Sequence, residues 1–327
     1  MSELRWNPLL GEWVITATGR QDRTYLPSAT DCPLCPSRDP SMPTEIPRAD
    51  FEIVVFENRF PALRRELPTL TPNPSPFKGE GRVRAAQGVC EVVVYTPQHE
   101  GTLTDQPVSQ IYKLIRVWTD RYAALGALPF VKYVFIFENK GDVVGTTLHH
   151  PHGQIYAFPY VPPIPARELA AARAHRAETG RCLLCDIVAS ERGDGRRVIA
   201  ADEHFAAYVP FFARFPYEVH IAATAHRESL TEFTDVERWA LAQMLKEVLM
   251  RYDALFGISL PYMMVLHQAP VGGDPDAHFH IEFYPLNRTR EKLKYRAGCE
   301  SGAGTFVTDA LPEEWAAQLA ASSVRRV

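Results

Sequence analysis

The stretch HHPHGQ, residues 149–154, carries three histidines within four positions and closes with glycine and glutamine. His150 and His152 are separated by one residue, so on an extended backbone their imidazoles point to the same side. One can hold a metal while the other faces a pocket and acts as a general base or a nucleophile. Gly153 lets a phosphate approach the chain, and Gln154 can donate an amide hydrogen to an oxyanion. The chemistry that fits this combination best is attack on phosphorus.

Four of the six cysteines form two C-x-x-C pairs. In a cytosolic protein such pairs are more often metal ligands or redox dithiols than structural disulfides. A tetrahedral zinc site needs four nitrogen or sulfur donors, of which a pair supplies two thiolates. Histidines that follow at corresponding places complete two predicted zinc sites, Cys32, Cys35, His99 and His150 in the first and, by the logic of a repeat, Cys182, Cys185, His226 and His278 in the second.

The elements that must position these residues occur twice in the same order. After each cysteine pair come a β-rich run ending in Arg-Phe-Pro, an amphipathic helix, an apolar strand and a strand with alternating histidines. The helices are expected at 105–128 and 234–257, where apolar residues recur at three and four positions. This duplication predicts an α+β fold of two pseudo-symmetric, histidine-triad-like halves, 1–160 and 161–327, with packed helices and antiparallel sheets that are shared or juxtaposed. The proline-rich stretch 158–166 is the expected hinge.

The composition limits the partners. The 327 residues are 46% hydrophobic and 23% charged, which is typical of a globular protein. A net charge of -4 gives no basic surplus for nucleic acid or an anionic membrane. The N-terminus shows no signal-peptide pattern and no apolar run approaches 18 residues, so we expect a cytoplasmic protein without a membrane span.

These motifs resemble those of the galactose-1-phosphate uridylyltransferases, a branch of the histidine triad superfamily. The resemblance covers nearly the whole chain and is carried by HPHGQ, NPLLGEW, GRQDR, DCPLC, YTPQH, FENKG, RFPYEV, RYDALFG, the second histidine strand and KYRAGCE. It implies that His152 attacks the α-phosphorus of UDP-glucose, releases glucose 1-phosphate and carries a covalent uridylyl group. Galactose 1-phosphate then takes this group to give UDP-galactose, in a ping-pong reaction of galactose metabolism.

The resemblance also implies how the substrates are held. Gln154 would bind the phosphoryl oxygens, and the other substrate-binding residues would be Arg20, Arg23, Asn58, Asn139, Thr147, Gly153, Lys294 and Glu300. The two arginines often reach phosphate in the neighbouring subunit's site, which implies a homodimer with shared active sites. Cys299 stands where many members of the family carry tyrosine, a difference that bears on sugar recognition.

A second metal has two alternative sites. Some members of the family bind a second metal, Fe²⁺ or Zn²⁺, through one glutamate and three histidines. Three of those positions match Glu168, His267 and His280, and Glu282 replaces the last. Those members lack a second cysteine pair, so we favour zinc at the second pair and keep the glutamate–histidine set as the alternative. Either site is expected to stabilise the native fold.

Two other activities remain as alternatives on the same fold. Relatives that act on ADP-glucose usually carry serine in place of Gly153, so the glycine favours the uridylyl donor. Histidine triad hydrolases carry a third histidine where this chain has Gln154, which cannot act as a general acid or base. Transfer to an acceptor is therefore favoured over hydrolysis.

Overall fold

The two halves share one sheet. The computed structural model describes residues 2–22, 26–39, 41, 43–67, 70 and 83–322. Its nine-stranded antiparallel sheet has the order β3-β5-β7-β6-β11-β12-β10-β9-β8. The strands are β3 (Val54–Glu57), β5 (Val89–Val94), β7 (His152–Phe158), β6 (Tyr133–Lys140), β11 (Tyr262–His267), β12 (His280–Pro285), β10 (Val219–Ala223), β9 (Phe205–Tyr208) and β8 (Val198–Ala201). The order reads outward in the same way from the central β6–β11 pair, so the predicted pseudo-symmetry is confirmed.

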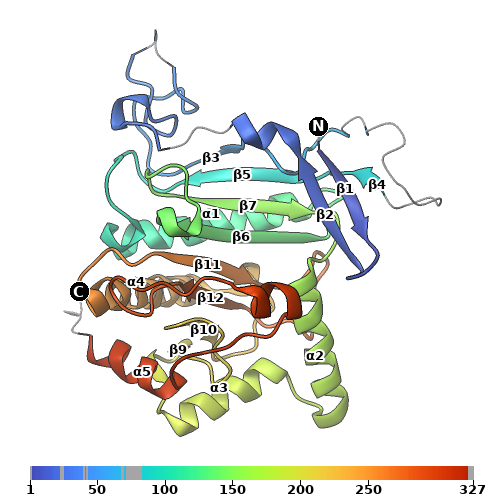
Figure 1. Cartoon of the computed structure of the whole chain (residues 1–327), viewed down its shortest axis with the longest axis vertical. Coiled ribbons are helices and arrows are strands. Elements are labelled where there is room, and N and C mark those ends of the chain that lie inside the picture. The colour runs from blue at the N-terminus through green and yellow to red at the C-terminus, as the bar shows by residue number, and fades with distance from the viewer. Residues whose placement is uncertain are drawn as a thin grey trace.

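Two long helices cover one face of this sheet. Helices α1 (Val108–Gly126) and α4 (Asp235–Phe256) lie side by side behind the strands (Figure 1). In α1 the apolar side chains at three- and four-residue spacing, including Trp118, are buried in the main core. Helix α4 begins with a capping box, in which Thr234 and Glu237 each accept a hydrogen bond from the other's backbone N–H. Both helices were predicted from the sequence.

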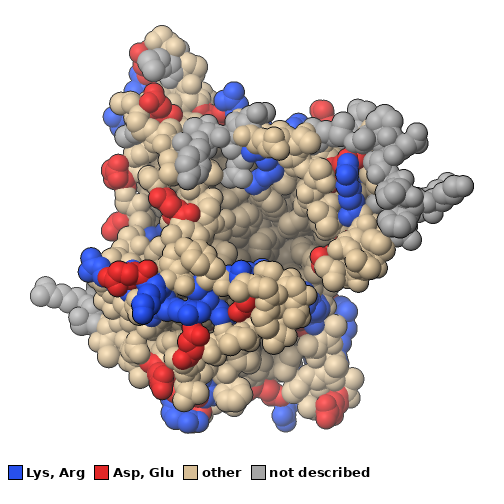
Figure 2. Space-filling view, viewed as in Figure 1, with Lys and Arg blue, Asp and Glu red and all other residues tan. Residues whose placement is uncertain are grey.

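The alternation of side chains leaves the histidines on the opposite face. In β7, Gly153 and Ile155 are buried toward the helices, whereas His152 and Gln154 are half-buried on the other side. In β12, His280 takes the place that His152 has in β7. Figure 2 shows that this second face is hollowed, with Lys and Arg side chains along one edge of the hollow.

Smaller elements complete the fold. A three-stranded sheet has the order β2-β1-β4, and three further helices lie at the periphery (Figure 1). These elements are β1 (Ser2–Asn7), β2 (Glu12–Ala17), β4 (Val83–Ala85), α2 (Pro163–Thr179), α3 (Leu183–Asp194) and α5 (Pro312–Ala321), with a turn of π-helix at Cys299–Ala303. Helix α2 begins inside the stretch that the sequence indicated as a hinge, because proline is well tolerated in the first turn of a helix.

Two predictions concern residues that lie wholly or mostly outside the described part of the chain. They are Arg23 and residues 67–82, whose proline, glycine and charged residues indicate a surface loop. Within the described part of the chain, no helix combines the length and the apolar character that crossing a bilayer requires.

Candidate active site

The backbone fixes the tautomer of His152. Its Nδ1 lies 2.7 Å from the carbonyl oxygen of His150. A carbonyl oxygen can only accept a hydrogen bond, so Nδ1 carries the proton and donates it. In the neutral ring the lone pair is then on Nε2, the nitrogen that faces away from this carbonyl. The arrangement prepares His152 to act as a nucleophile through Nε2.

A polar cavity begins at His152 and Gln154. Its lining also includes Arg20, Phe137, Asn139, Gly145, Thr146, Thr147 and Tyr156. The Arg20 guanidinium donates hydrogen bonds to Tyr156 Oη at 3.1 Å and to the Phe60 carbonyl oxygen at 3.4 Å. One cation and several neutral hydrogen-bonding groups therefore surround His152, as a phosphate site requires.

Arg20 belongs to the same chain as the cavity that it lines. The family resemblance places this arginine often in the neighbouring subunit's site, and Arg23 lies outside the described residues. The homodimer therefore stays a prediction.

A second, largely apolar cavity extends from the same two residues. It is lined by Pro33, Leu34, Glu45, Phe56, Asn58, Arg59, Phe60, Val92, Thr147, Leu148, His152 and Gln154. Asn58 Oδ1 accepts a hydrogen bond from the Phe60 backbone N–H at 2.8 Å, so the group that Asn58 offers to a ligand is its amide N–H. At the rim, Arg59 and Glu45 form an ion pair of 3.2 Å. Aromatic and aliphatic walls, with the Asn58 and Gln154 amides among the polar groups, suit a planar base with carbonyl groups.

Sequence reasoning singled out Asn58 but missed the walls around it. Phe56 and Phe60 flank it at alternate positions of FENRF, a pattern that could have indicated a shared face. Leu34 and Val92 come from distant segments, and only the folded chain brings them together with Asn58.

The role of Gly153 differs from the expectation. A Cβ atom at this position would overlap the hydroxyl oxygen of Tyr95 and lie 3.1 Å from the Phe137 carbonyl oxygen. Gly153 points into the buried side of the sheet, opposite the face that carries His152. The glycine is therefore required by packing beneath the strand and not by the approach of a phosphate.

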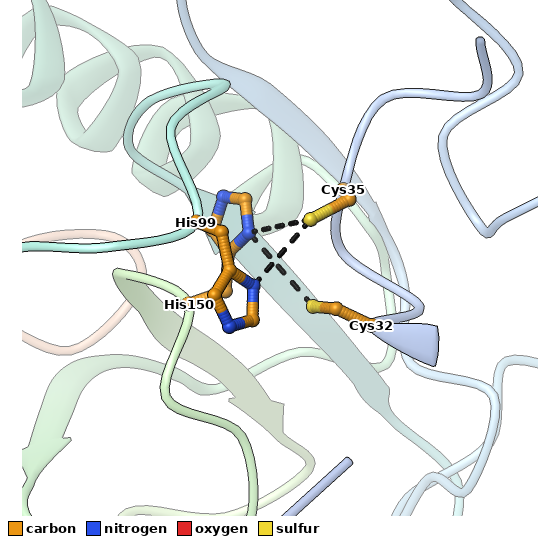
Figure 3. Close-up of side chains that lie close together, drawn as sticks. All are labelled: Cys32, Cys35, His99 and His150. Atoms are coloured by element: carbon orange, nitrogen blue, oxygen red, sulfur yellow. Dashed lines mark hydrogen bonds between the residues drawn. The ribbon is translucent and has the colours of Figure 1, made fainter. Parts of the chain in front are cut away.

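The first predicted metal set comes together (Figure 3). The ligand atoms of Cys32, Cys35, His99 and His150 lie within 4.8 Å of one another. Cys35 Sγ lies 3.4 Å from His99 Nδ1 and 3.6 Å from His150 Nδ1, and tetrahedral zinc with ordinary bond lengths would set such a pair about 3.5 Å apart. Burial raises the pKa of the Cys32 thiol to about 12, so its thiolate needs an adjacent cation. The donor set fits Zn²⁺.

The second cysteine set repeats this geometry. The ligand atoms of Cys182, Cys185, His226 and His278 also lie within 4.8 Å of one another. His278 Nε2 donates to the Ala223 carbonyl oxygen at 2.9 Å, just as His150 Nε2 donates to Thr96 at 2.8 Å, and each ring presents Nδ1 to the thiols. Cys182 is the N-cap of α3, an element that the sequence did not predict, and Cys185 lies in its first turn.

The alternative set, Glu168, His267 and His280, forms as well. His267 Nδ1 lies 2.7 Å from Glu168 Oε2, and the rings of His267 and His280 stack at 4.8 Å. Glu282 lies 3.5 Å from His280 Nε2 and 3.3 Å from His220 Nε2. The sequence treated this set and the second cysteine set as alternatives, but the structure assembles both.

Lys294 and Glu300 form an ion pair with each other and lie outside the two cavities at His152. Their charged atoms lie 3.1 Å apart, and both side chains are 5% exposed. Neither lines the cavities at His152. Backbone hydrogen bonds and the Lys294 ammonium lower the pKa of Glu300 to about 2. Cys299, next to this pair, is exposed.

A nine-stranded antiparallel sheet with a histidine strand in each half defines an α+β protein built from two similar halves. The N-terminal domain of galactose-1-phosphate uridyl transferase, as a family model, matches residues 1–162, and the corresponding C-terminal domain matches 168–319. The chain therefore belongs to the galactose-1-phosphate uridyl transferase family.

Individual relatives agree with this assignment. Galactose-1-phosphate uridylyltransferase of Thermotoga maritima is 44% identical over 99% of both chains. The rat protein of the same name is 33% identical over 97% of this chain and 86% of its own. A solved uridylyltransferase structure superposes with a TM-score of 0.87 at 36% identity over 98% of both chains.

Proposed function

We propose that this protein transfers UMP between UDP-glucose and galactose 1-phosphate through a covalent uridylyl group on His152. The observation that carries the proposal is the hydrogen bond from His152 Nδ1 to the His150 carbonyl oxygen, which puts the lone pair of the neutral ring on Nε2. The shared name of the relatives in bacteria and rat supports the donor and the acceptor.

The first half-reaction forms a phosphorus–nitrogen bond and breaks a phosphorus–oxygen bond. His152 Nε2 attacks the α-phosphorus of UDP-glucose, and glucose 1-phosphate leaves with the electron pair of the broken bond. The imidazolium that results keeps its Nδ1–H on the backbone carbonyl. Arg20, Gln154 and Asn139 line the cavity where phosphoryl charge develops, and hydrogen-bond donors in this position stabilise it.

The second half-reaction reverses the first with another acceptor. A phosphate oxygen of galactose 1-phosphate attacks the same phosphorus, and His152 leaves as a neutral ring. Gln154 can donate a hydrogen bond but cannot remove a proton from water. An acceptor that is already ionised needs no such base, so transfer is favoured over hydrolysis.

The uridylyl donor is supported by the relatives of this chain, which are named galactose-1-phosphate uridylyltransferases. The amide N–H of Asn58 is suited to the carbonyl oxygens of uracil. The ring nitrogens of adenine also accept an N–H, so the names of the relatives, and not this contact, carry the choice. UDP-glucose is therefore proposed over ADP-glucose.

Zinc is proposed at the two Cys₂His₂ sets, where it would stabilise the fold by binding only the native state. The third set, with two carboxylates nearby, would hold Fe²⁺ or Zn²⁺. Elemental analysis of the purified protein tests the two zinc sites. Cys32→Ser and Cys185→Ser should each remove one zinc per chain. A variant that keeps its full zinc content would exclude that cysteine as a ligand.

The assembly is proposed to be a cytoplasmic homodimer with shared active sites, because Arg20 and Arg23 resemble the arginines that reach phosphate in the neighbouring subunit's site. Lys294 and Glu300 are proposed to bind the hexose and its phosphate. Sedimentation of the purified protein tests the stoichiometry. Mixing His152→Ala and Arg20→Met chains, each expected to be inactive alone, tests the sharing: partial recovery of activity requires that one site uses both chains.

The mass of the intact protein after brief incubation with UDP-glucose tests the main proposal. We expect a gain of one uridylyl group, which disappears when galactose 1-phosphate is added. His152→Gly should form no adduct but should regain turnover with a pre-formed uridylyl imidazolide. A gain only with ADP-glucose would reassign the donor, and steady release of free nucleotide without an adduct would indicate a hydrolase.

A further inference from the structure

Tyr95 contacts the nucleophile strand on both sides of His152. Its backbone N–H donates to the Pro151 carbonyl oxygen at 3.1 Å. Its hydroxyl oxygen lies against Gly153, in the volume that a Cβ atom would occupy. Tyr95 directly follows β5, in which Val94 is paired with His152. One residue therefore holds the backbone immediately before and immediately after the nucleophile.

The Tyr95 hydroxyl group is hydrogen-bonded to a buried carboxyl group, that of Glu138. Tyr95 Oη donates to Glu138 Oε2 at 3.3 Å, and Tyr262 Oη donates to the other oxygen of the same carboxyl group, also at 3.3 Å. Tyr95 and Tyr262 are 1% and 0% exposed, and Glu138 is 4% exposed, so these contacts are shielded from water. Burial raises the pKa of Glu138 to about 7. The Lys140 ammonium lies over the Tyr262 ring and pairs with Asp253.

We propose that Tyr95 is a positioning residue, whose Glu138-anchored hydroxyl supports Gly153 from the buried face and so fixes His152 and Gln154 for transfer. The inference rests on the proposed function, because it concerns the same nucleophile. A small displacement of a catalytic group can reduce a rate by two orders of magnitude, so support of the backbone from below matters for the reaction.

This contact also gives a structural reason for glycine at position 153. Because residue 153 points away from the cavities, its side chain does not meet the nucleotide base. A serine at this position requires that the Tyr95 hydroxyl be absent or displaced. Glycine at position 153 therefore matches the Tyr95 hydroxyl group that is packed beneath it.

Four variants test the inference: Tyr95→Phe, Gly153→Ala, the double variant, and Tyr262→Phe as the matched control. The control also removes a hydroxyl that donates to Glu138, but it removes none that touches Gly153. The rate of uridylyl adduct formation is measured over a range of UDP-glucose concentrations, and thermal unfolding is measured without substrate.

We expect Tyr95→Phe to slow the maximal rate of adduct formation severalfold at unchanged half-saturating UDP-glucose, while Tyr262→Phe leaves that rate within a factor of two. Gly153→Ala should slow it at least tenfold and lower the unfolding temperature, and adding Tyr95→Phe should recover most of both losses. Equal rates in the two Tyr→Phe variants would overturn the inference.

The thermal stability of the Gly153→Ala variant tests the contact between Tyr95 and Gly153 independently of the donor. If Tyr95→Phe relieves none of its thermal destabilisation, the proposed contact is wrong, whatever the donor. If the wild-type protein forms no adduct with UDP-glucose, the proposed function is wrong. The unfolding temperatures of the four variants then decide the contact separately, since they require no substrate.

Discussion

Asn58→Asp tests whether Asn58 recognises the nucleotide base. It changes one hydrogen-bonding group of the apolar cavity and keeps the size of the side chain. An aspartate Oδ1 can still accept the Phe60 N–H, which Asn58 accepts at 2.8 Å, so the local turn is retained. The other branch of the side chain changes from an amide donor into a carboxylate oxygen. A base carbonyl that met an N–H in the wild type would then meet a negatively charged acceptor.

The expected loss can be estimated from this exchange. Leaving a buried carbonyl without its hydrogen bond costs about 1–3 kcal/mol, which corresponds to roughly a 5- to 150-fold fall in kcat/KM for UDP-glucose. ADP-glucose should lose much less, because the adenine amino group can donate to the carboxylate. The ratio of the two kcat/KM values should therefore shift toward the adenylyl donor, by up to roughly 5- to 150-fold.

The assay is the rate of nucleotidyl adduct formation on His152 with each donor, at concentrations below saturation. Asn58→Leu serves as a second variant, since it removes the donor without adding charge. An unchanged unfolding temperature would show that Asn58→Asp retains the fold. Equal losses for the two donors in both variants would refute base recognition by Asn58 and leave it with a role in the turn alone.

Three further perturbations test the electrostatics of the fold. Arg121→Met should lower the free energy of unfolding in urea by about 3 kcal/mol. The reason is that Glu91, which is 4% exposed and accepts hydrogen bonds from Arg121 at 2.6 Å and 2.9 Å, would lose its partner. Adding Glu91→Gln should recover most of this loss of stability. Lys294→Met should destabilise the protein at pH 7, and the difference from wild type should shrink as the pH falls toward 2, where Glu300 takes up its proton. Glu138 has a pKa of about 7 in the folded protein, so the folded state holds a proton that the unfolded chain has lost above pH 4.5. Stability should fall between these values by at most about 1.4 kcal/mol per pH unit, and Glu138→Gln should remove that slope in urea titrations.

The duplicated elements could be predicted because their signals are local. Both long helices carry an apolar stripe of helical period, and both histidine strands alternate, so α1, α4, β7 and β12 followed from spacing alone. The sequence could not show whether the two halves share one continuous sheet or carry two juxtaposed sheets. That choice depends on the pairing of β6 with β11, which joins residues about 125 positions apart in the sequence, as in Phe137 opposite Val265.

The two clusters of cysteine and histidine were predictable for a different reason. A C-x-x-C pair fixes two ligands within one turn, and the repeat locates the remaining histidines by analogy, so both sets assemble as expected. The contact of Tyr95 with Gly153, beneath the strand that carries His152, was not predictable. Tyr95 and Glu138 look like ordinary strand residues, and only the folded sheet shows that they meet at Gly153.

The two halves show why one histidine strand is proposed to carry the reaction and the other a metal. His280 Nδ1 donates to the His278 carbonyl oxygen at 2.9 Å, the same bond that prepares His152, so the backbone offers a nucleophilic ring twice. The difference lies two residues further on, where Gln154 corresponds to Glu282.

That difference is large enough to decide which ligand binds. A carboxylate about 4 Å from a phosphoryl oxygen opposes it by about 4 kcal/mol at the effective dielectric of a protein surface, or roughly a thousandfold in binding. Glu168 adds a second negative charge beside His280, whereas Arg20 places a positive one in the cavity with His152. The same strand geometry thus favours an anionic nucleotide in the first half and a cation in the second, and the fold alone would not distinguish them.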